Sequence, residues 1–277
     1  FKYTAFDENE ITNFYVKRPG STFESYTKNI FIHEPDGIYS FYAVDIAGNE
    51  SAVYEICFDS TLPIINLMGD NGSVNNGSIV GGTKISADAV DEGSGVLKME
   101  YMSPSMTSYS TYIPGYELIE EGKYYFKATD YAGNVSSVVD ITLDKTPPVL
   151  TIKEGLNTIQ SGSIIKAPSV TVLATDSLSG VKKIEYKFSD FGSFSEYTEG
   201  TVITEEGIHE FRAIDNVGNV SYISTVILDR TAPIIKIEAN GVEVTNKYIN
   251  KDYLNVFGVD EYSSSSVYIK KENSEFL

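Results

Sequence analysis

The sequence DYAGN (130–134) decides the fold, because it recurs with small changes as DIAGN (45–49) and DNVGN (215–219). The three copies lie 85 residues apart. Flanking residues keep the same interval: Gly37, Gly122 and Gly207; Asp59, Asp144 and Asp229; Pro63, Pro148 and Pro233. A fixed period marks a repeat protein. The period of 85 residues exceeds the roughly 20–50 residues of solenoid repeats. The period therefore predicts tandem domains, each long enough to bury a small core.

The residues before the repeated phrase alternate between apolar and polar side chains. In GKYYFKATD (122–130), Tyr124, Phe126 and Ala128 share one face, and this period of two is typical of a half-buried strand. The other copies agree: Tyr39, Phe41 and Ala43; His209, Phe211 and Ala213. The segments after the phrase also alternate: Val139, Ile141 and Leu143; Tyr54, Ile56 and Phe58; Ser224, Val226 and Leu228. The phrase thus predicts a turn between antiparallel strands, in which Gly133 supplies a positive φ and Asp130 accepts turn amides.

About seven short strands per period, without helical periodicity, predict an all-β fold of tandem Ig-like β-sandwich domains in an elongated array. Tyr39 and Tyr124 follow acidic-glycine turns at the start of the penultimate strand, where a tyrosine corner is expected. His209 takes this position in the third copy, which puts the corner in doubt there. The expected domains are two complete repeats and two partial ones, so we expect an excerpt of a longer protein: 1–61 (partial, without its first strand), 62–146, 147–231 and 232–277 (partial, first strands only).

The composition limits the partners. The 277 residues include 39 acidic and 21 basic side chains, for a formal net charge of −18. This balance argues against nucleic acid or an anionic membrane as the main partner, because both need clustered Lys and Arg. No apolar run approaches the roughly 20 residues of a membrane span. The single cysteine, Cys57, excludes an internal disulfide and leaves an intermolecular one open.

Several segments together resemble the bacterial immunoglobulin-like (Big-type) repeats of surface and secreted proteins. They are AVDEGSGV (89–96) and ATDSLSGV (174–181), EEGKYYFKATDYAGNVS (120–136) and EEGIHEFRAIDNVGNVS (205–221), and LDKTPP (143–148) and LDRTAP (228–233). The resemblance implies a β-sandwich and an extracellular or cell-surface location. It also implies use as a stalk, an adhesin segment or an accessory module, since one such fold serves many functions.

Repeated aspartates are the main candidates for a chemical site. In an Ig-type sandwich, the BC and FG loops lie at one end, and the last strand exits at the other end. The last strand of one repeat therefore leads to the end of the next repeat where the BC and FG loops of that next repeat lie. We therefore expect two clusters: Asp59, Asp91 and Asp130; Asp144, Asp176 and Asp215. Clustered carboxylates suit Ca²⁺, which takes 6–8 oxygen ligands. The alternative is that each aspartate caps amides of its own turn or linker. Both interpretations remain open at this point.

Other residue types give weaker indications. The two histidines, His33 and His209, have no repeated Ser or Cys partner, so no catalytic site and no enzyme activity are expected. Tyr109 and Tyr112 match Phe194 and Tyr197 one period later, which indicates packing. Only three tyrosines look specific to one repeat, and these could stack on sugars: Tyr42, Tyr116 and Tyr131. The glycosylation sequon at Asn49, Asn134 and Asn219 is explained by turn chemistry.

Three functions are compatible with these patterns. The leading one is a non-enzymatic spacer that projects or links the neighbouring domains of a bacterial cell-surface or secreted protein. The second is an adhesin segment that binds a host protein or glycan, in which one repeat would carry an exposed aromatic cluster that its sisters lack. The third is an accessory module of a secreted hydrolase.

Overall fold

The computed structural model describes residues 11–26, 35–188, 192–244 and 254–268. Every element in these residues is a β-strand, so the all-β class expected from the sequence is confirmed. Within the described ranges, no helix is long and apolar enough to span a membrane. The chain divides into two compact units, Phe1–Lys145 and Thr146–Leu277.

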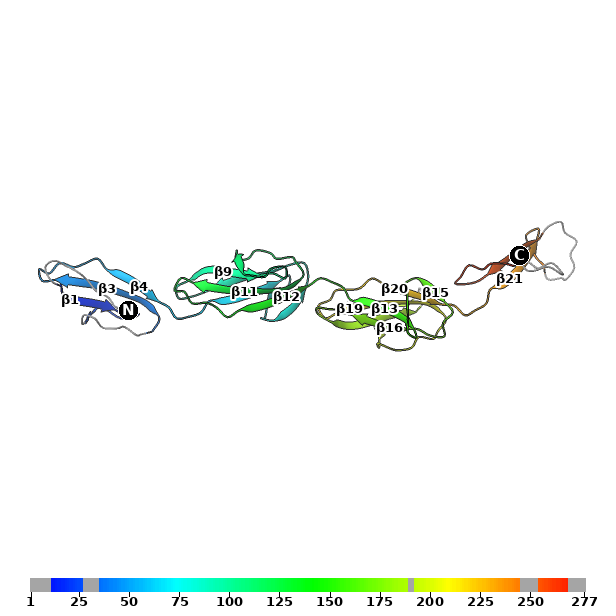
Figure 1. Ribbon diagram of the computed structural model, residues 1–277, viewed down its shortest axis with the longest axis horizontal. Helices are drawn as coiled ribbons and strands as arrows, with labels where there is room; N and C mark the ends of the chain where they lie inside the picture. The colour runs from blue at the N-terminus through cyan, green and yellow to red at the C-terminus, as the bar shows by residue number, and fades with distance from the viewer. Residues whose placement is uncertain (1–10, 27–34, 189–191, 245–253, 269–277) are drawn as a thin grey trace. The chain divides into compact units, whose positions relative to one another are not determined.

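The first unit contains a complete β-sandwich. Its strands are β5 (Ile64–Gly69), β6 (Gly72–Val74), β7 (Ser78–Gly81), β8 (Ile85–Val90), β9 (Val96–Met102), β10 (Ser110–Tyr112), β11 (Gly122–Asp130) and β12 (Val139–Asp144). One sheet has the order β6-β5-β8, and the other has the order β10-β9-β11-β12-β7. Figure 1 shows β9, β11 and β12 side by side in the larger sheet. Neighbours pair antiparallel except for β7 and β12, which are parallel.

The core of this sandwich comes from the alternating residues of the facing strands. Tyr124, Phe126 and Ala128 of β11 are almost completely buried, as their period of two predicts. They pack with residues of both sheets: Leu67, Ile85, Ala87, Met99, Tyr112, Leu118, Ile141 and Leu143. The rings of Tyr112 and Phe126 meet edge to face, with centroids 5.2 Å apart. The interior of the repeat is therefore a single cluster that joins its two sheets.

The first unit also holds a four-stranded sheet with the order β2-β1-β3-β4. Its strands are β1 (Ile11–Lys17), β2 (Glu24–Tyr26), β3 (Gly37–Asp45) and β4 (Tyr54–Phe58). Tyr39, Phe41 and Ala43 are buried as expected. Tyr54, which the alternation places on the same face, is 59% exposed. It lies opposite Phe41 at the first position of β4, where the described residues do not cover it.

The second unit repeats this architecture. Its strands are β13 (Val149–Glu154), β14 (Asn157–Ile159), β15 (Ser163–Ile165), β16 (Thr171–Thr175), β17 (Val181–Phe188), β18 (Ser195–Tyr197), β19 (Gly207–Asp215), β20 (Ser224–Leu228), β21 (Ile234–Ala239), β22 (Val242–Glu243) and β23 (Asn255–Val259). The sheets have the orders β14-β13-β16, β15-β20-β19-β17-β18 and β22-β21-β23. The strand order of the sandwich in the first unit thus recurs with equivalent strands. The division into four domains stays a prediction.

The repeated phrase forms the turn after β11. The amide of Asp130 donates to the carbonyl of Asn134 (3.1 Å), and Gly133 adopts a φ of 95°. Ser136 then continues the ladder, because its amide donates to the carbonyl of Ala128 and its Oγ accepts from the Ala128 amide, both at 2.9 Å. The serine of the sequon therefore has a structural role.

The tyrosine corner is present in two copies, and the third has an equivalent histidine contact. The hydroxyl of Tyr39 donates to the carbonyl of Pro35 (2.9 Å), and that of Tyr124 donates to the carbonyl of Glu120 (2.7 Å). His209 makes the equivalent contact, with Nε2 2.9 Å from the carbonyl oxygen of Glu205. The third copy therefore has no tyrosine at its corner, but an imidazole nitrogen reaches the equivalent carbonyl four residues upstream.

Candidate functional site

Asp59 lies between β4 and β5 and joins the four-stranded sheet to the sandwich that follows it in the first unit. Its side chain accepts hydrogen bonds from the Thr61 amide (2.9 Å), the Thr61 hydroxyl (2.5 Å) and the Ser94 amide (2.7 Å). Its own carbonyl accepts a hydrogen bond from Nδ2 of Asn134 (3.0 Å). One aspartate thus contacts the linker, the loop after β8 and the turn after β11.

The approach of Asp59 to the loop after β8 depends on a glycine. A Cβ atom on Gly93 would lie 2.4 Å from the carboxyl carbon of Asp59. Real Cβ atoms essentially never make contacts this short, so the loop admits the carboxylate only because this residue has no side chain. The equivalent residue one period later is Leu178, so this feature belongs to one repeat.

Asp91 and Asp130 complete the group. Asp91 follows β8, and its carboxylate accepts from the Gly95 amide (2.8 Å) and the Thr61 hydroxyl (3.3 Å). Asp130 ends β11, is fully buried, and accepts from the amide (2.7 Å) and Nδ2 (2.8 Å) of Asn134. Each of Asp59, Asp91 and Asp130 offers an oxygen within 4.8 Å of the others. We call these three residues the Asp59 cluster.

The hydrogen bonds that Asp59 accepts favour its ionised form. Hydrogen bonds from Ser94 and Thr61 hold the pKa of Asp59 well below its usual range. None of the ion pairs found among the described residues connects Lys or Arg to these three aspartates. Three carboxylates therefore lie close together with amides and hydroxyls as donors, an arrangement that stabilises a chain turn and also resembles a hard-cation site.

The second group expected from the sequence divides between the two units. Asp144 ends β12 in the first unit, whereas Asp176 and Asp215 belong to the second unit, where their oxygens approach within 4.8 Å. Asp176 accepts from the Gly180 amide (2.7 Å), and Asp215 accepts from the Asn219 amide (2.8 Å), as Asp91 and Asp130 do one period earlier. The assembly of Asp144 with this pair stays a prediction.

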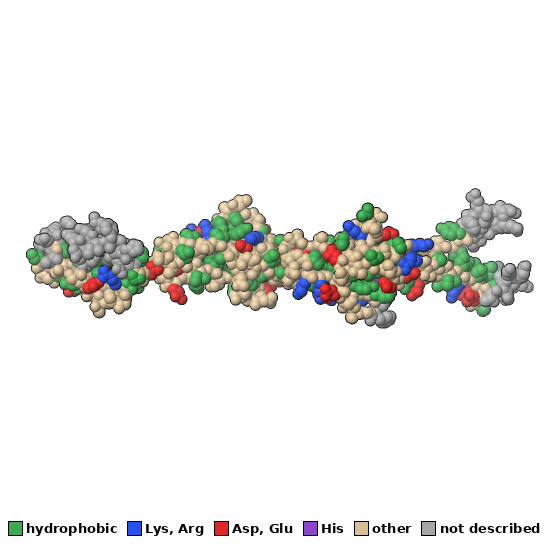
Figure 2. Space-filling model, turned by 90° about the horizontal axis from the view of Figure 1, so that it is seen from below, with side chains coloured by type: hydrophobic (Ala, Val, Ile, Leu, Met, Phe, Trp, Pro, Cys, Tyr) green, Lys and Arg blue, Asp and Glu red, His purple; other side chains and the backbone are tan. Residues whose placement is uncertain are grey.

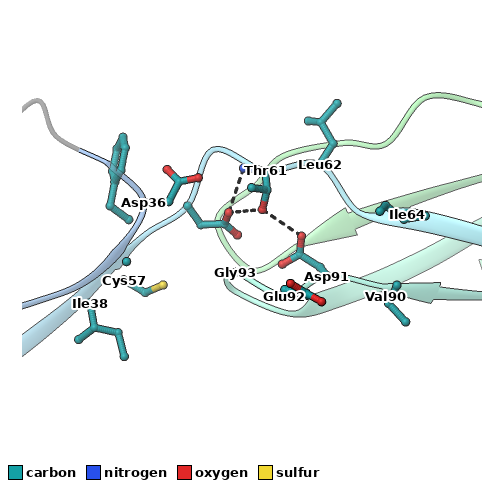
Figure 3. Close-up of a pocket in the computed structure, with 13 residues that line it drawn as sticks. Asp36, Ile38, Cys57, Thr61, Leu62, Ile64, Val90, Asp91, Glu92 and Gly93 are labelled. Atoms are coloured by element: carbon teal, nitrogen blue, oxygen red, sulfur yellow. Dashed lines mark hydrogen bonds between the residues drawn. The ribbon is translucent and has the colours of Figure 1, made fainter. Parts of the chain in front are cut away.

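A pocket of about 560 Å³ adjoins the Asp59 cluster (Figure 3). Its lining combines apolar residues with acidic ones: Ile38, Cys57, Leu62, Ile64 and Val90; Asp36, Asp59, Asp91 and Glu92. Figure 3 shows Thr61 near Asp91, whose carboxylate it contacts, and the Thr61 hydroxyl also contacts Asp59. Sequence reasoning missed this pocket, because its apolar residues come from four separate segments and follow no common period.

The remaining candidates have structural surroundings. His209 is fully buried, and its Nδ1 lies 3.0 Å from the hydroxyl of Tyr186. His33 lies outside the described residues. Cys57 is exposed as a free thiol. Tyr112 and Tyr197 are buried in their cores, whereas Tyr109 lies beneath the Nζ of Lys127 at 4.4 Å.

Charged side chains of both signs are distributed over the face drawn in Figure 2. On the face drawn in Figure 2, Lys and Arg side chains stand in small groups among acidic and polar residues.

Comparisons with known proteins give little guidance. No protein-family model and no curated protein matches the chain. Among solved structures, the chain is similar to the fibronectin(III)-like modules of CbhA from Clostridium thermocellum, with 17% identity over 60% of this chain and 93% of that chain, and a TM-score of 0.29. These values are too low to support a conclusion. The class of this protein, tandem β-sandwich, therefore rests on its strand order and cores.

Proposed function

We propose that this chain is a non-enzymatic spacer segment of a bacterial cell-surface or secreted protein, built from Big-type immunoglobulin-like repeats. The observation that carries the proposal is the set of contacts made by Asp59. A linker residue that binds its own linker, the loop after β8 and the turn after β11 fixes the direction in which one repeat follows another. Three residues that make these contacts recur at the 85-residue interval, as a repeated junction requires, although Gly93 is replaced by Leu178: Asp144 for Asp59, Ser179 for Ser94 and Asn219 for Asn134.

Small-angle X-ray scattering of the full chain tests the spacer proposal. The Asp59→Ala variant removes the side-chain acceptors of Thr61 and Ser94, and we expect a broader distribution of interatomic distances than in the unchanged chain. Asp70→Ala is the matched control, because Asp70 accepts from the Thr83 amide (2.7 Å) inside one sandwich and contacts no linker. Scattering curves that are identical for the unchanged chain and Asp59→Ala would refute the role of Asp59 in holding the junction.

Calcium at the Asp59 cluster is the second part of the proposal. Three carboxylates within 4.8 Å supply hard oxygen ligands, and carbonyls or waters would complete the 6–8 that Ca²⁺ takes. Bound calcium would also reduce the repulsion among the three charges. Its role would be to stiffen the linker, with no catalytic step.

Isothermal titration of the metal-free full chain with CaCl₂ tests this part. We expect binding in the unchanged chain and a loss of one site in Asp91→Asn, while the melting temperature of the unchanged chain rises when calcium replaces EDTA. If neither heat nor a shift in melting temperature appears at about millimolar calcium, the aspartates serve only as hydrogen-bond acceptors. The scattering test of the spacer proposal stands independently of this result.

A further inference from the structure

The sandwich of the first unit carries a hollow apart from the Asp59 cluster. It lies between the loop after β9 and the loop that joins β10 to β11, and its volume is about 310 Å³. Tyr101 and Tyr124 line it from the strands. Ser103, Ser105 and Met106 line one side, and residues 116–120 line the other. This is close to the lower limit of the roughly 300–1,000 Å³ of small-ligand sites.

The equivalent positions of the second unit are filled differently. Ser103 corresponds to Phe188, whose ring stacks on His209 with centroids 5.0 Å apart. His209 is itself the counterpart of Tyr124. A phenyl ring thus packs on the corner residue in the second unit, whereas the first unit has the smaller Ser103 near Tyr124. The two sandwiches therefore differ in the side chain at this position.

The loop beside the hollow is also specific to this repeat. Ile113, Tyr116 and Ile119 are 71%, 60% and 66% exposed. Their counterparts one period later are all threonines: Thr198, Thr201 and Thr204. Large apolar side chains exposed together on one short loop are a feature of binding surfaces. Tyr116 lines the hollow and offers an aromatic ring to a ligand.

The polar groups of the hollow form a connected set. The hydroxyl of Ser105 donates to Oε2 of Glu120 (2.9 Å) and lies 3.1 Å from the hydroxyl of Ser103. Glu117, also in the lining, pairs with Lys84. These carboxylates and hydroxyls accept hydrogen bonds from a ligand rich in hydroxyl groups. They disfavour an anionic ligand, because it would add a third negative charge beside Glu117 and Glu120.

We propose that this hollow binds a neutral pyranose ring of a glycan. A pyranose has an apolar face of C–H groups, which would stack on the ring of Tyr116, and a rim of hydroxyls, which would hydrogen-bond to Ser103, Ser105 and Glu120. An apolar peptide side chain would fit less well, since it would remove water from these polar groups and give no hydrogen bond in return. The inference goes beyond the spacer role and does not depend on it.

Saturation-transfer NMR on the full chain tests the proposal, with the methyl glycosides of glucose, galactose, mannose and N-acetylglucosamine as probes. A small, open site predicts a Kd of about millimolar for at least one of them. Tyr116→Thr and Ser103→Phe introduce the residues of the second unit, and each should weaken binding at least tenfold. Tyr222→Thr is the control: Tyr222 is 94% exposed in the second unit, so its loss should change nothing.

Three outcomes would overturn the proposal. One is the absence of any signal from all four glycosides at about 10 mM, an excess over the expected Kd. Another is unchanged binding in Tyr116→Thr, a surface substitution that leaves the core intact. The last concerns a basic apolar peptide, acetyl-Lys-Leu-Lys-amide. If this peptide binds, Tyr116→Thr abolishes its binding, and no glycoside binds, the site recognises protein.

Discussion

Replacing Tyr124 by phenylalanine tests the tyrosine corner without changing the shape of the core. The side chain of Tyr124 is 1% exposed, and its hydroxyl donates to the carbonyl of Glu120 at 2.7 Å. The substitution removes the Tyr124 hydroxyl and leaves the Glu120 carbonyl without this hydrogen bond. A buried hydrogen bond of this kind contributes about 1 kcal/mol net, and an unsatisfied partner adds to its loss. We therefore expect the free energy of unfolding to fall by about 1.5 kcal/mol.

Differential scanning calorimetry of the full chain measures the effect. For a domain of about this size, 1.5 kcal/mol corresponds to a fall of roughly 6–12 °C in melting temperature. Because a chain with several domains unfolds in more than one step, only the transition of the substituted repeat should move. Tyr125→Phe is the control, since Tyr125 lies on the opposite face of β11 and is partly exposed. A shift in Tyr124→Phe no larger than that in Tyr125→Phe would refute the reasoning.

Further predictions concern the second unit and the linker. Burial lowers the pKa of His209 from its ordinary 6.5, so the unfolded chain binds more protons below that pH. The free energy of unfolding of the second unit should be highest above pH 6.5 and should fall as the pH drops from 6.5 toward the lowered pKa. Urea denaturation between pH 5 and 8 should show this dependence. The His209→Gln variant should lack it. Gly93→Ala forces a Cβ against Asp59 and should lower the free energy of unfolding, measured by chemical denaturation, by about 1–3 kcal/mol. A variant as stable as the unchanged chain would show that the loop moves to accommodate the Cβ.

The strands could be predicted from the sequence because packing in a sandwich buries one face of each strand, and this burial produces the alternation of apolar and polar residues. Tyr124, Phe126 and Ala128 are buried because a sandwich needs one apolar face on each strand. Tyr54 obeys the alternation and yet is exposed, because burial also requires a covering element, which a local pattern does not reveal. The sequence left the hydrogen bond at the third corner in doubt, because histidine replaces tyrosine there. The side chain of His209 nevertheless reaches the equivalent carbonyl oxygen.

The candidate site was predictable in position but incompletely in chemistry. The 85-residue period and the ends of the sandwich place Asp59, Asp91 and Asp130 together, and their oxygens do lie within 4.8 Å. The reach of Asn134 to the carbonyl of Asp59 and the space left by Gly93 were not predictable, because both depend on the path of the linker in three dimensions. The elongated array and the assembly at Asp144 stay predictions.

The parallel pairing of β7 with β12 has a mechanical consequence. Tension applied through the ends of a repeat pulls these two strands in opposite directions along their length, so their hydrogen bonds are loaded in shear and resist together. The pairing joins four residues on each strand in the first unit, from Ser78–Ile141 to Gly81–Asp144. Its counterpart, β15 with β20, joins only three. Under a steadily rising pull, the sandwich of the second unit should therefore rupture first and extend the chain while its neighbour is still folded.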